Sequence, residues 1–221
     1  MTRFLAGGFS AGGITLLSGL FSRLCLSCRH PSGSGTLCIP CRDDPAWRAP
    51  IAFSIRGGIP TRSLFPDTGA PGRLFRVAKF SGNRHALDLL LDRGEVAGLS
   101  PPGVSLLLPV PPHRTRLIRR DLSIPDILAH RLSNGKTPLC LAGIVRTGRH
   151  TQKGHSRQER REAFFSPHFR VDPGSLSGLP KSGLVIVDDL LVTGWTARSI
   201  VRLLALSGME SLAIVTLLYR D

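Results

Sequence analysis

The stretch LVIVDDLLVTGWT, residues 184–196, decides the fold of this 221-residue chain. Its first four residues are apolar and are typical of a buried strand, and a helix is expected over residues 197–207, ended by Gly208. In open α/β sheets, ligands bind at the carboxyl ends of the strands, which is where Asp188 and Asp189 fall. The stretch therefore predicts a ligand site on a parallel sheet.

The chemistry of this site follows from the loop after the aspartates, which reads Thr193, Gly194, Trp195, Thr196. Gly194 lets the backbone approach a phosphate, and the free amide groups of a helix N-terminus donate to its oxygens. The hydroxyls of both threonines add donors. Because a carboxylate pair just before such a loop can accept hydrogen bonds from sugar hydroxyls, we predict a pocket for a ribose 5-phosphate group.

Two other interpretations of the same residues exist. An apolar run ending in aspartates is also the magnesium-binding strand of P-loop nucleotide hydrolases, but the G-x-x-x-x-G-K-[ST] loop that these require is absent from the chain. In the other interpretation, Asp188 and Asp189 merely end a strand and cap the next helix. The residues alone leave that second possibility open.

Further strands and helices alternate on both sides of the motif, and the strands are continuously apolar, which favours a parallel α/β sheet covered on both faces. Ser123 and Pro125 are suited to the cap and first turn of one helix. Residues 45–72, rich in Pro, Gly and Arg, suggest an irregular linker. The expected strands are 74–78, 104–110, 139–145, 184–187 and 211–219, and the expected helices are 84–97, one that begins after Ser123, and 197–207.

Four cysteines near the N-terminus, Cys25, Cys28, Cys38 and Cys41, have the spacing C-x2-C-x9-C-x2-C. Each C-x-x-C turn can present two thiolates to one tetrahedral zinc ion, and four thiolates leave no open position, so a structural site is expected. Two disulfides are the alternative. Cys140 stands alone in an apolar run and is expected in the core. We expect residues 1–50 to form an N-terminal helix and zinc module, and residues 51–221 to form the α/β domain.

The chain carries 29 Lys and Arg against 15 Asp and Glu, a formal charge of +14, which favours anionic partners such as phosphorylated small molecules or nucleic acid. Residues 4–24 are largely uncharged, but glycines and serines interrupt them, and we interpret them as a tail and a helix ending near Phe21 rather than a signal peptide or membrane span. The protein is therefore expected in the reducing cytoplasm, with thiolate cysteines.

The 184–196 motif resembles the phosphoribosyl pyrophosphate signature of type I phosphoribosyltransferases, and the larger arrangement resembles the ComF family, named for bacterial competence. The resemblance extends to the four cysteines, to KFSG beginning at Lys79, to the run at 106–121 and to the run at 151–164. It implies a type I phosphoribosyltransferase-like domain with a small N-terminal zinc module.

The resemblance also implies roles for two basic segments. Residues 109–120 would be the pyrophosphate loop, whose arginines neutralise the diphosphate leaving group; a solvated basic loop is the alternative. Residues 146–161 would be a hood over the ligand, with a nucleic-acid contact or a disordered excursion as alternatives. The residues expected to act in transfer are Asp188, Asp189, Arg114, Arg119 and Arg120, with Arg116 beside them. The ligand-binding residues are expected to be Lys79, Gln152, Arg157, Arg160, Asp188, Asp189, Thr193, Gly194, Trp195 and Thr196, and Arg161 also matches the family pattern.

The chain departs from the family pattern in places. Val192 stands where the family usually has Thr, and Trp195 where it has a small residue, so one phosphate-binding hydroxyl is lost. The R-G-F-N-Q-like run after the pyrophosphate loop is also replaced, which puts turnover in more doubt than binding. Two function hypotheses follow: transfer of phosphoribosyl, with magnesium on the diphosphate, to an acceptor that the sequence does not identify; or a non-enzymatic accessory protein of DNA uptake that contacts single-stranded DNA or a helicase-like partner. Aromatic residues, at 6%, offer few platforms for base stacking.

Overall fold

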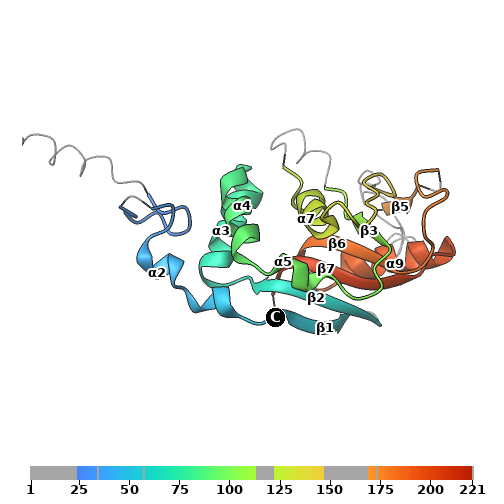
Figure 1. Cartoon of the computed structure of the whole chain (residues 1–221), viewed down its shortest axis with the longest axis horizontal. Coiled ribbons are helices and arrows are strands. Elements are labelled where there is room, and N and C mark those ends of the chain that lie inside the picture. Colours follow the sequence, from blue (N-terminus) through green and yellow to red (C-terminus); the bar gives the residue numbers. More distant parts are fainter. Residues whose placement is uncertain are drawn as a thin grey trace, which may run out of the picture.

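The computed structural model describes residues 24–33, 35–56, 58–112, 122–146, 169–172 and 174–220. Its centre is a five-stranded sheet of order β1-β2-β7-β6-β3 (Figure 1). The three pairings β2 with β7, β7 with β6 and β6 with β3 are parallel, and β1 joins the edge antiparallel to β2. The strands of this sheet are β1 (Ala52–Arg56), β2 (Ile59–Pro66), β3 (Leu106–Pro109), β6 (Leu184–Leu191) and β7 (Ser211–Tyr219).

Helices and a small hairpin-like pair of strands surround the sheet. The longer helices are α3 (Gly69–Ser81), α4 (Arg84–Arg93), α7 (Ile124–Ser133) and α9 (Trp195–Leu206). The short ones are α2 (Ile39–Arg42), η1 (Pro45–Arg48) and α5 (Val96–Leu99), and β4 (Ile144–Arg146) pairs antiparallel with β5 (Phe169–Val171).

The sheet buries a separate hydrophobic cluster on each face, because successive side chains of a strand point to opposite sides. In β6, Val185 and Val187 pack with α3, α4 and α7, whereas Leu184 and Ile186 pack with α9 and with the β4–β5 pair. All four are fully buried. The prediction of an α/β fold with a parallel sheet covered on both faces is confirmed, except that the edge strand β1 is antiparallel to β2.

The cysteine segment, by which we mean the described residues between 24 and 48, is not separated from this core. Cys25, Cys38 and Cys41 belong to the same buried cluster as residues of α3, and Trp47 packs edge-on against Phe65 of β2 with ring centroids 5.4 Å apart. In Figure 1 the segment lies at one end of the molecule, beside α3. Contacts therefore run without a break from the cysteines to the sheet.

Two parts of the sequence interpretation are wrong. Residues 74–78, expected as a strand, form the middle of α3. Residues 45–72, expected as a linker, contain η1, β1, β2 and the start of α3. β2 pairs with β1 from Ile59 to Ser63 and with β7 from Thr61 to Pro66, so this segment is an interior strand despite the prolines at its second and last positions.

Other expectations differ only at their ends. The strand at 211–219 is confirmed as β7, β6 continues four residues beyond the expected 187, and α9 starts at Trp195. The expected helix 84–97 ends at Arg93, and the expected strand 139–145 is reduced to β4 and a parallel bridge between Leu139 and Leu107. Cys140 is half-buried against the hydrophobic cluster that contains Leu184, Ile186 and α9. The expected helix ending near Phe21 lies outside the described residues. In the part of the chain that the structure describes, no helix has both the length and the apolar character to cross a membrane.

Candidate functional site

The chain leaves β3 and β6 toward opposite faces of the sheet, and the carboxyl ends of these two strands are where α/β sheets of this kind open toward a ligand; below, "crevice" means this strand-end edge. From β3 the chain passes through α7, on one face, to Leu139, which bridges back to Leu107 in the parallel sense. From β6 it passes through α9, on the other face, to β7 on the opposite side. Ligands of open α/β sheets bind where strand order reverses in this way.

Asp188 and Asp189 lie at this crevice. The last pair between β3 and β6 joins Pro109 to Val187, and the backbone amide of Val110 then donates to the carbonyl of Val187 at 2.8 Å. The two aspartates are the next residues of β6, past the end of β3. The structure therefore brings the acidic pair to the edge predicted from the sequence.

Lys79 is the positive partner of this pair. Its Nζ lies 2.7 Å from Oδ2 of Asp189, and the side chains are only 16% and 21% exposed, respectively. Lys79 stands in the last turn of α3, which ends at Gly82 in the left-handed conformation, φ 64°. The KFSG segment thus ends a helix whose final turn points a charge at the acidic pair.

Asp188 has a different environment from Asp189. Burial raises the pKa of the Asp188 carboxyl to about 7, and the negative charge of Asp189 adds to the rise. The hydrogen bond from the backbone amide of Asp189 to Oδ1 of Asp188, at 2.8 Å, and the charges of Lys79 and Arg146 oppose it. Near neutral pH, Asp188 can therefore bind or release a proton while Asp189 stays paired with Lys79.

The loop after β6 opens directly into α9. Gly194 has φ 68° and ψ 10°, a left-handed conformation that non-glycine residues rarely adopt, and it occupies the N-cap position of the helix. Because glycine has no side chain, Gly194 cannot cap the first amides of α9. The amide of Trp195 makes only a long contact, 3.4 Å, to Oγ1 of Thr193. Amides of this kind are suited to an anion.

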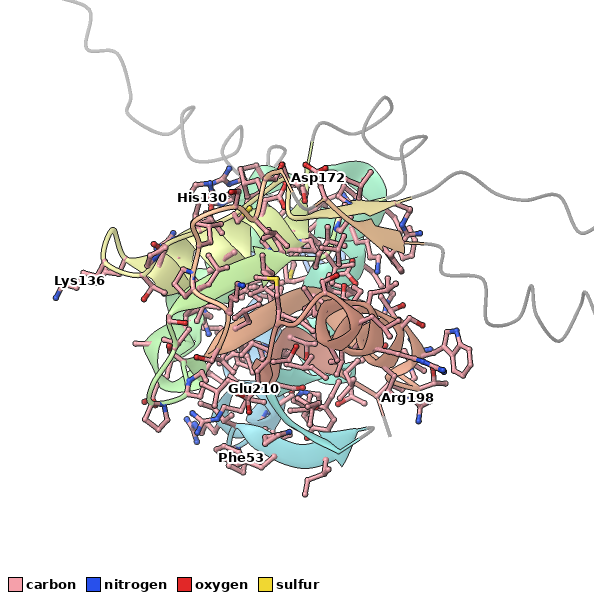
Figure 2. The ribbon with its side chains drawn as sticks, turned by 90° about the vertical axis from the view of Figure 1, so that its right-hand side faces the viewer. Phe53, His130, Lys136, Asp172, Arg198 and Glu210 are labelled. Carbon is pink, nitrogen blue, oxygen red and sulfur yellow. The ribbon has the colours of Figure 1, made fainter. Side chains whose placement is uncertain are left out.

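The rim of the loop is apolar and basic. Val192 and Trp195 are each 42% exposed, and the guanidinium of Arg198 lies 5.7 Å from the centre of the Trp195 ring. Arg198 also donates to the carbonyl of Thr193 at 3.1 Å. Figure 2 shows Arg198 on the side of the molecule that carries α9. The Trp195 side chain therefore lies at the surface and does not fill the crevice.

Several predicted site residues lie outside the described residues: Arg114, Arg116, Arg119, Arg120, Gln152, Arg157, Arg160 and Arg161. Those that the structure brings near the loop and the strand ends are Lys79, Asp188, Asp189, Thr193, Gly194, Trp195 and Thr196.

Two basic residues were not singled out from the sequence. Arg146 ends β4 close enough to act on the charge of Asp188, and its guanidinium lies 4.7 Å from the centre of the Phe169 ring. Arg198 contacts the loop between β6 and α9. The signal for Arg198 was its place in the first turn of the helix after the motif. Arg146 was predicted only as the start of a basic segment.

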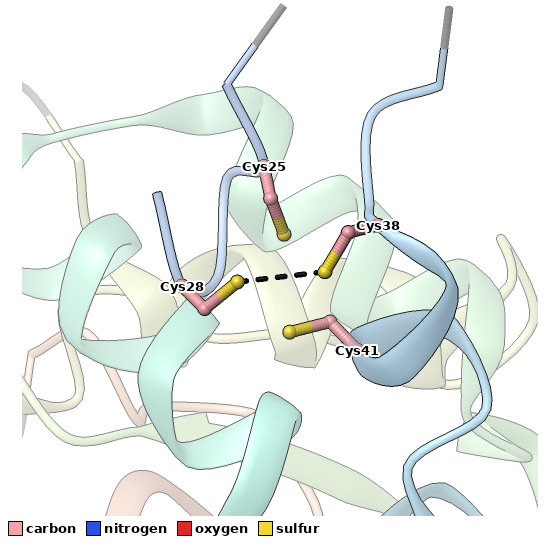
Figure 3. Close-up of side chains that lie close together, drawn as sticks. All are labelled: Cys25, Cys28, Cys38 and Cys41. Atoms are coloured by element: carbon pink, nitrogen blue, oxygen red, sulfur yellow. Dashed lines mark hydrogen bonds between the residues drawn. The ribbon is translucent and has the colours of Figure 1, made fainter. Parts of the chain in front are cut away.

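The four cysteines form a second site. Figure 3 shows Cys25, Cys28, Cys38 and Cys41 pointing toward one another, and all four sulfur atoms lie within 4.8 Å of each other. Zinc with four Zn–S bonds of about 2.3 Å sets its sulfurs about 3.8 Å apart. The sulfurs of Cys28 and Cys38 are 3.4 Å apart, too far for a disulfide, and all four residues are free cysteines. The donor set fits tetrahedral zinc.

The thiols differ in acidity. Burial raises the pKa of Cys25, but hydrogen bonds from the backbone of Cys28, Cys38 and Ser27 outweigh it and bring the pKa down to about 6. Arg73 of α3 donates to the Cys41 sulfur at 3.4 Å. At Cys38 a hydrogen bond from the backbone of Cys41 lowers the pKa, but burial and hydrogen bonds with the other three thiols outweigh it and raise the pKa to about 12. Thiolate is the form that binds metal, so the backbone amides around Cys25 favour a bound cation.

Comparison with known proteins gives one informative similarity. Over 110 residues, 49% of this chain, the sequence is 30% identical to Competence protein F of Haemophilus influenzae. This similarity agrees with the resemblance to the ComF family that the cysteines and the 184–196 motif carry. The matched part spans about half of that protein, 47% of its length. No family model matches the chain.

Proposed function

We propose that the crevice at the carboxyl ends of β3 and β6 binds the ribose 5-phosphate part of phosphoribosyl pyrophosphate or of a related molecule. The observation that carries the proposal is the placement of Asp188 and Asp189 in β6 just past the end of β3, with left-handed Gly194 and the N-terminus of α9 in the loop that follows β6. The carboxylates would accept hydrogen bonds from the ribose hydroxyls, and the amides of the loop would donate to the 5-phosphate.

The same pocket is suited to transfer of the phosphoribosyl group to an acceptor. That reaction needs charge stabilisation of a leaving diphosphate and a fixed ribose rather than a protein nucleophile. In this proposal Lys79 holds Asp189 in place, and Arg114, Arg119 and Arg120 neutralise the diphosphate. Magnesium, bound with the diphosphate, would supply further positive charge. The acceptor is not identified.

Calorimetric titration tests the pocket. Wild type and three variants, Asp188→Asn/Asp189→Asn, Gly194→Val and Trp195→Ala, are titrated with phosphoribosyl pyrophosphate, ribose 5-phosphate and a nucleoside monophosphate, with magnesium present. Each bond to a charged acceptor is worth about 1.5–3 kcal/mol, so the aspartate variant should lose roughly ten-fold to hundred-fold in affinity per bond. Trp195→Ala is the matched control, because an exposed ring at the rim is not required for phosphate binding. Equal affinity in wild type and the aspartate variant rejects the site.

A second function, favoured by the similarity to Competence protein F, is that of an accessory protein of DNA uptake in the cytoplasm. In this proposal the formal charge of +14 attracts single-stranded DNA. Affinity for an oligonucleotide should then fall steeply with salt as counterions are released, and neutralising Arg157, Arg160 and Arg161 together should flatten the slope. Absence of binding at low salt, or an unchanged slope, rejects this function.

A further inference from the structure

Arg73, in the second turn of α3, is tied to the cysteine segment by three contacts. Its Nη2 donates to the sulfur of Cys41 at 3.4 Å, and its Nε donates to Oγ of Ser27 at 3.0 Å. Nη2 also lies 3.6 Å from Oδ2 of Asp44. Ser27 stands between Cys25 and Cys28, so one guanidinium contacts both C-x-x-C turns.

The cysteine segment also supplies the cap of α3. Thr68, at the N-cap position, makes no capping hydrogen bond with its side chain. Oδ2 of Asp44 instead accepts from the backbone amide of Ala70 at 2.7 Å, while Oδ1 accepts from Ala46. Gly69 is required for this approach, since a Cβ there would lie 2.6 Å from the Asp44 carboxylate. The first turn of α3 therefore depends on a residue three positions after Cys41.

The other end of α3 carries Lys79, the partner of Asp189. One helix thus connects the sulfur cluster to the acidic pair. Outer partners that hydrogen-bond a metal ligand fix its orientation, and the stability of a helix end depends on its cap.

We propose that Arg73 joins the metal site and α3 into one cooperative unit. Arg73 positions Cys41 for the metal, and metal binding in turn keeps α3, with Lys79, ordered. The inference rests on zinc binding by the four cysteines and does not depend on the ligand of the crevice.

Metal affinity is the first test. Zinc is titrated into full-length wild type and Arg73→Gln in competition with a chelator of known affinity, and we expect about ten-fold to hundred-fold weaker binding in the variant. Arg76→Gln is the matched control, since Arg76 lies one turn further along α3 and pairs with Asp67 instead of the cysteine segment. Its affinity should equal that of wild type. Arg73→Lys, which keeps the charge and one donor group, should recover part of the loss.

Hydrogen exchange is the second test, because it reports helix order without any assay of activity. Removing zinc from wild type should speed amide exchange throughout α3, including the turn that holds Lys79, and leave β7 protected. If Arg73→Gln does not fold, Ser27→Ala, which removes only the acceptor for Nε, replaces it and should weaken zinc binding to a smaller extent.

Three outcomes overturn the inference. Equal zinc affinity in wild type and Arg73→Gln, or in wild type and Ser27→Ala where that variant replaces it, removes the role of Arg73. Exchange in α3 that is unaffected by the loss of zinc removes the coupling. A wild-type protein that takes up no zinc overturns the zinc assignment together with the inference, whereas the first two outcomes leave that assignment intact.

Discussion

At the scale of single residues, Asp188 and Asp189 show how two neighbouring carboxylates come to differ. Asp189 lies against the Lys79 ammonium, whereas Asp188 is partly buried and accepts a backbone amide. The consequence is one carboxylate that is ion-paired and one whose charge changes near neutral pH.

The raised pKa of Asp188 predicts the pH dependence of stability. Its pKa rises from the ordinary 3.8 to about 7 on folding, so between these values the folded protein binds more protons than the unfolded chain, and stability falls as pH rises. Asp188→Asn keeps the Oδ1 acceptor and cannot ionise. Relative to wild type, its melting temperature should therefore rise between about pH 4 and about pH 8. A difference between the two proteins that stays constant with pH contradicts the raised pKa.

The left-handed backbone of Gly194 predicts a loss of stability when this glycine is replaced. At φ 68° a β-branched side chain is strained, so Gly194→Val should lower the free energy of unfolding by about 1–2 kcal/mol. Denaturant unfolding measures this cost. Gly174→Val is the control, because the φ of Gly174 lies outside the left-handed region and a Cβ added there would meet no atom within 4 Å. Equal stability of the two variants would mean that Gly194 is not held in the left-handed conformation.

At the scale of helices and strands, α3 shows why one element was assigned wrongly. The apolar residues at its centre, Leu74, Phe75, Val77 and Ala78, form a short run that is also typical of a strand. The buried positions, however, include Pro71, Leu74, Phe75 and Ala78, which follow the three- and four-residue spacing of a helix face. Gly and Pro in the first turn obscured this spacing, since both are read as breakers unless they stand at a helix start.

The placement of the two aspartates ahead of a helix N-terminus was predicted better than α3, because its signal is local. The apolar strand residues, the two aspartates and the helix N-terminus all lie within residues 184–196. Their order along the chain can therefore be recognised without knowledge of the fold. The ion pair between Lys79 and Asp189 joins residues far apart in the chain and depends on how α3 packs on the sheet. Its geometry was therefore not available from the sequence, although Lys79 was assigned to the pocket through the family resemblance.

That ion pair predicts a measurable coupling between α3 and β6. Lys79→Met and Asp189→Asn should destabilise by amounts that are not additive, with an interaction energy of about 0.5–3 kcal/mol in a double-mutant cycle. The control cycle uses Arg84 and Asp88, an exposed pair on α4 at 2.9 Å, for which about 0.3–0.5 kcal/mol is expected. Additive effects at Lys79 and Asp189 would show that the pair does not connect the two elements.

At the scale of the whole molecule, the cysteine cluster predicts one zinc ion per chain. Elemental analysis of protein purified under reducing conditions measures it, and Cys38→Ser should lower the zinc content because it removes one of the four ligands. Zinc is worth on the order of 10 kcal/mol in small structural sites, so chelation should also lower the melting temperature. Metal-free protein, or full zinc content in Cys38→Ser, contradicts the prediction.

The neighbours of β2 in the sheet affect how the protein is made. Ser63 of β2 shares a buried hydrogen bond with Thr216 of β7, 153 residues away, at 2.6 Å, and Asp67 is bonded to the side chain of Arg220. A nascent chain on the ribosome therefore carries β2 and β3 with no strand between them until β7 has been synthesised. During that interval β2 presents an unpaired edge, and long-range pairing of this kind is slow. Translation of this protein thus leaves a half-built sheet exposed, which is the state that chaperones bind.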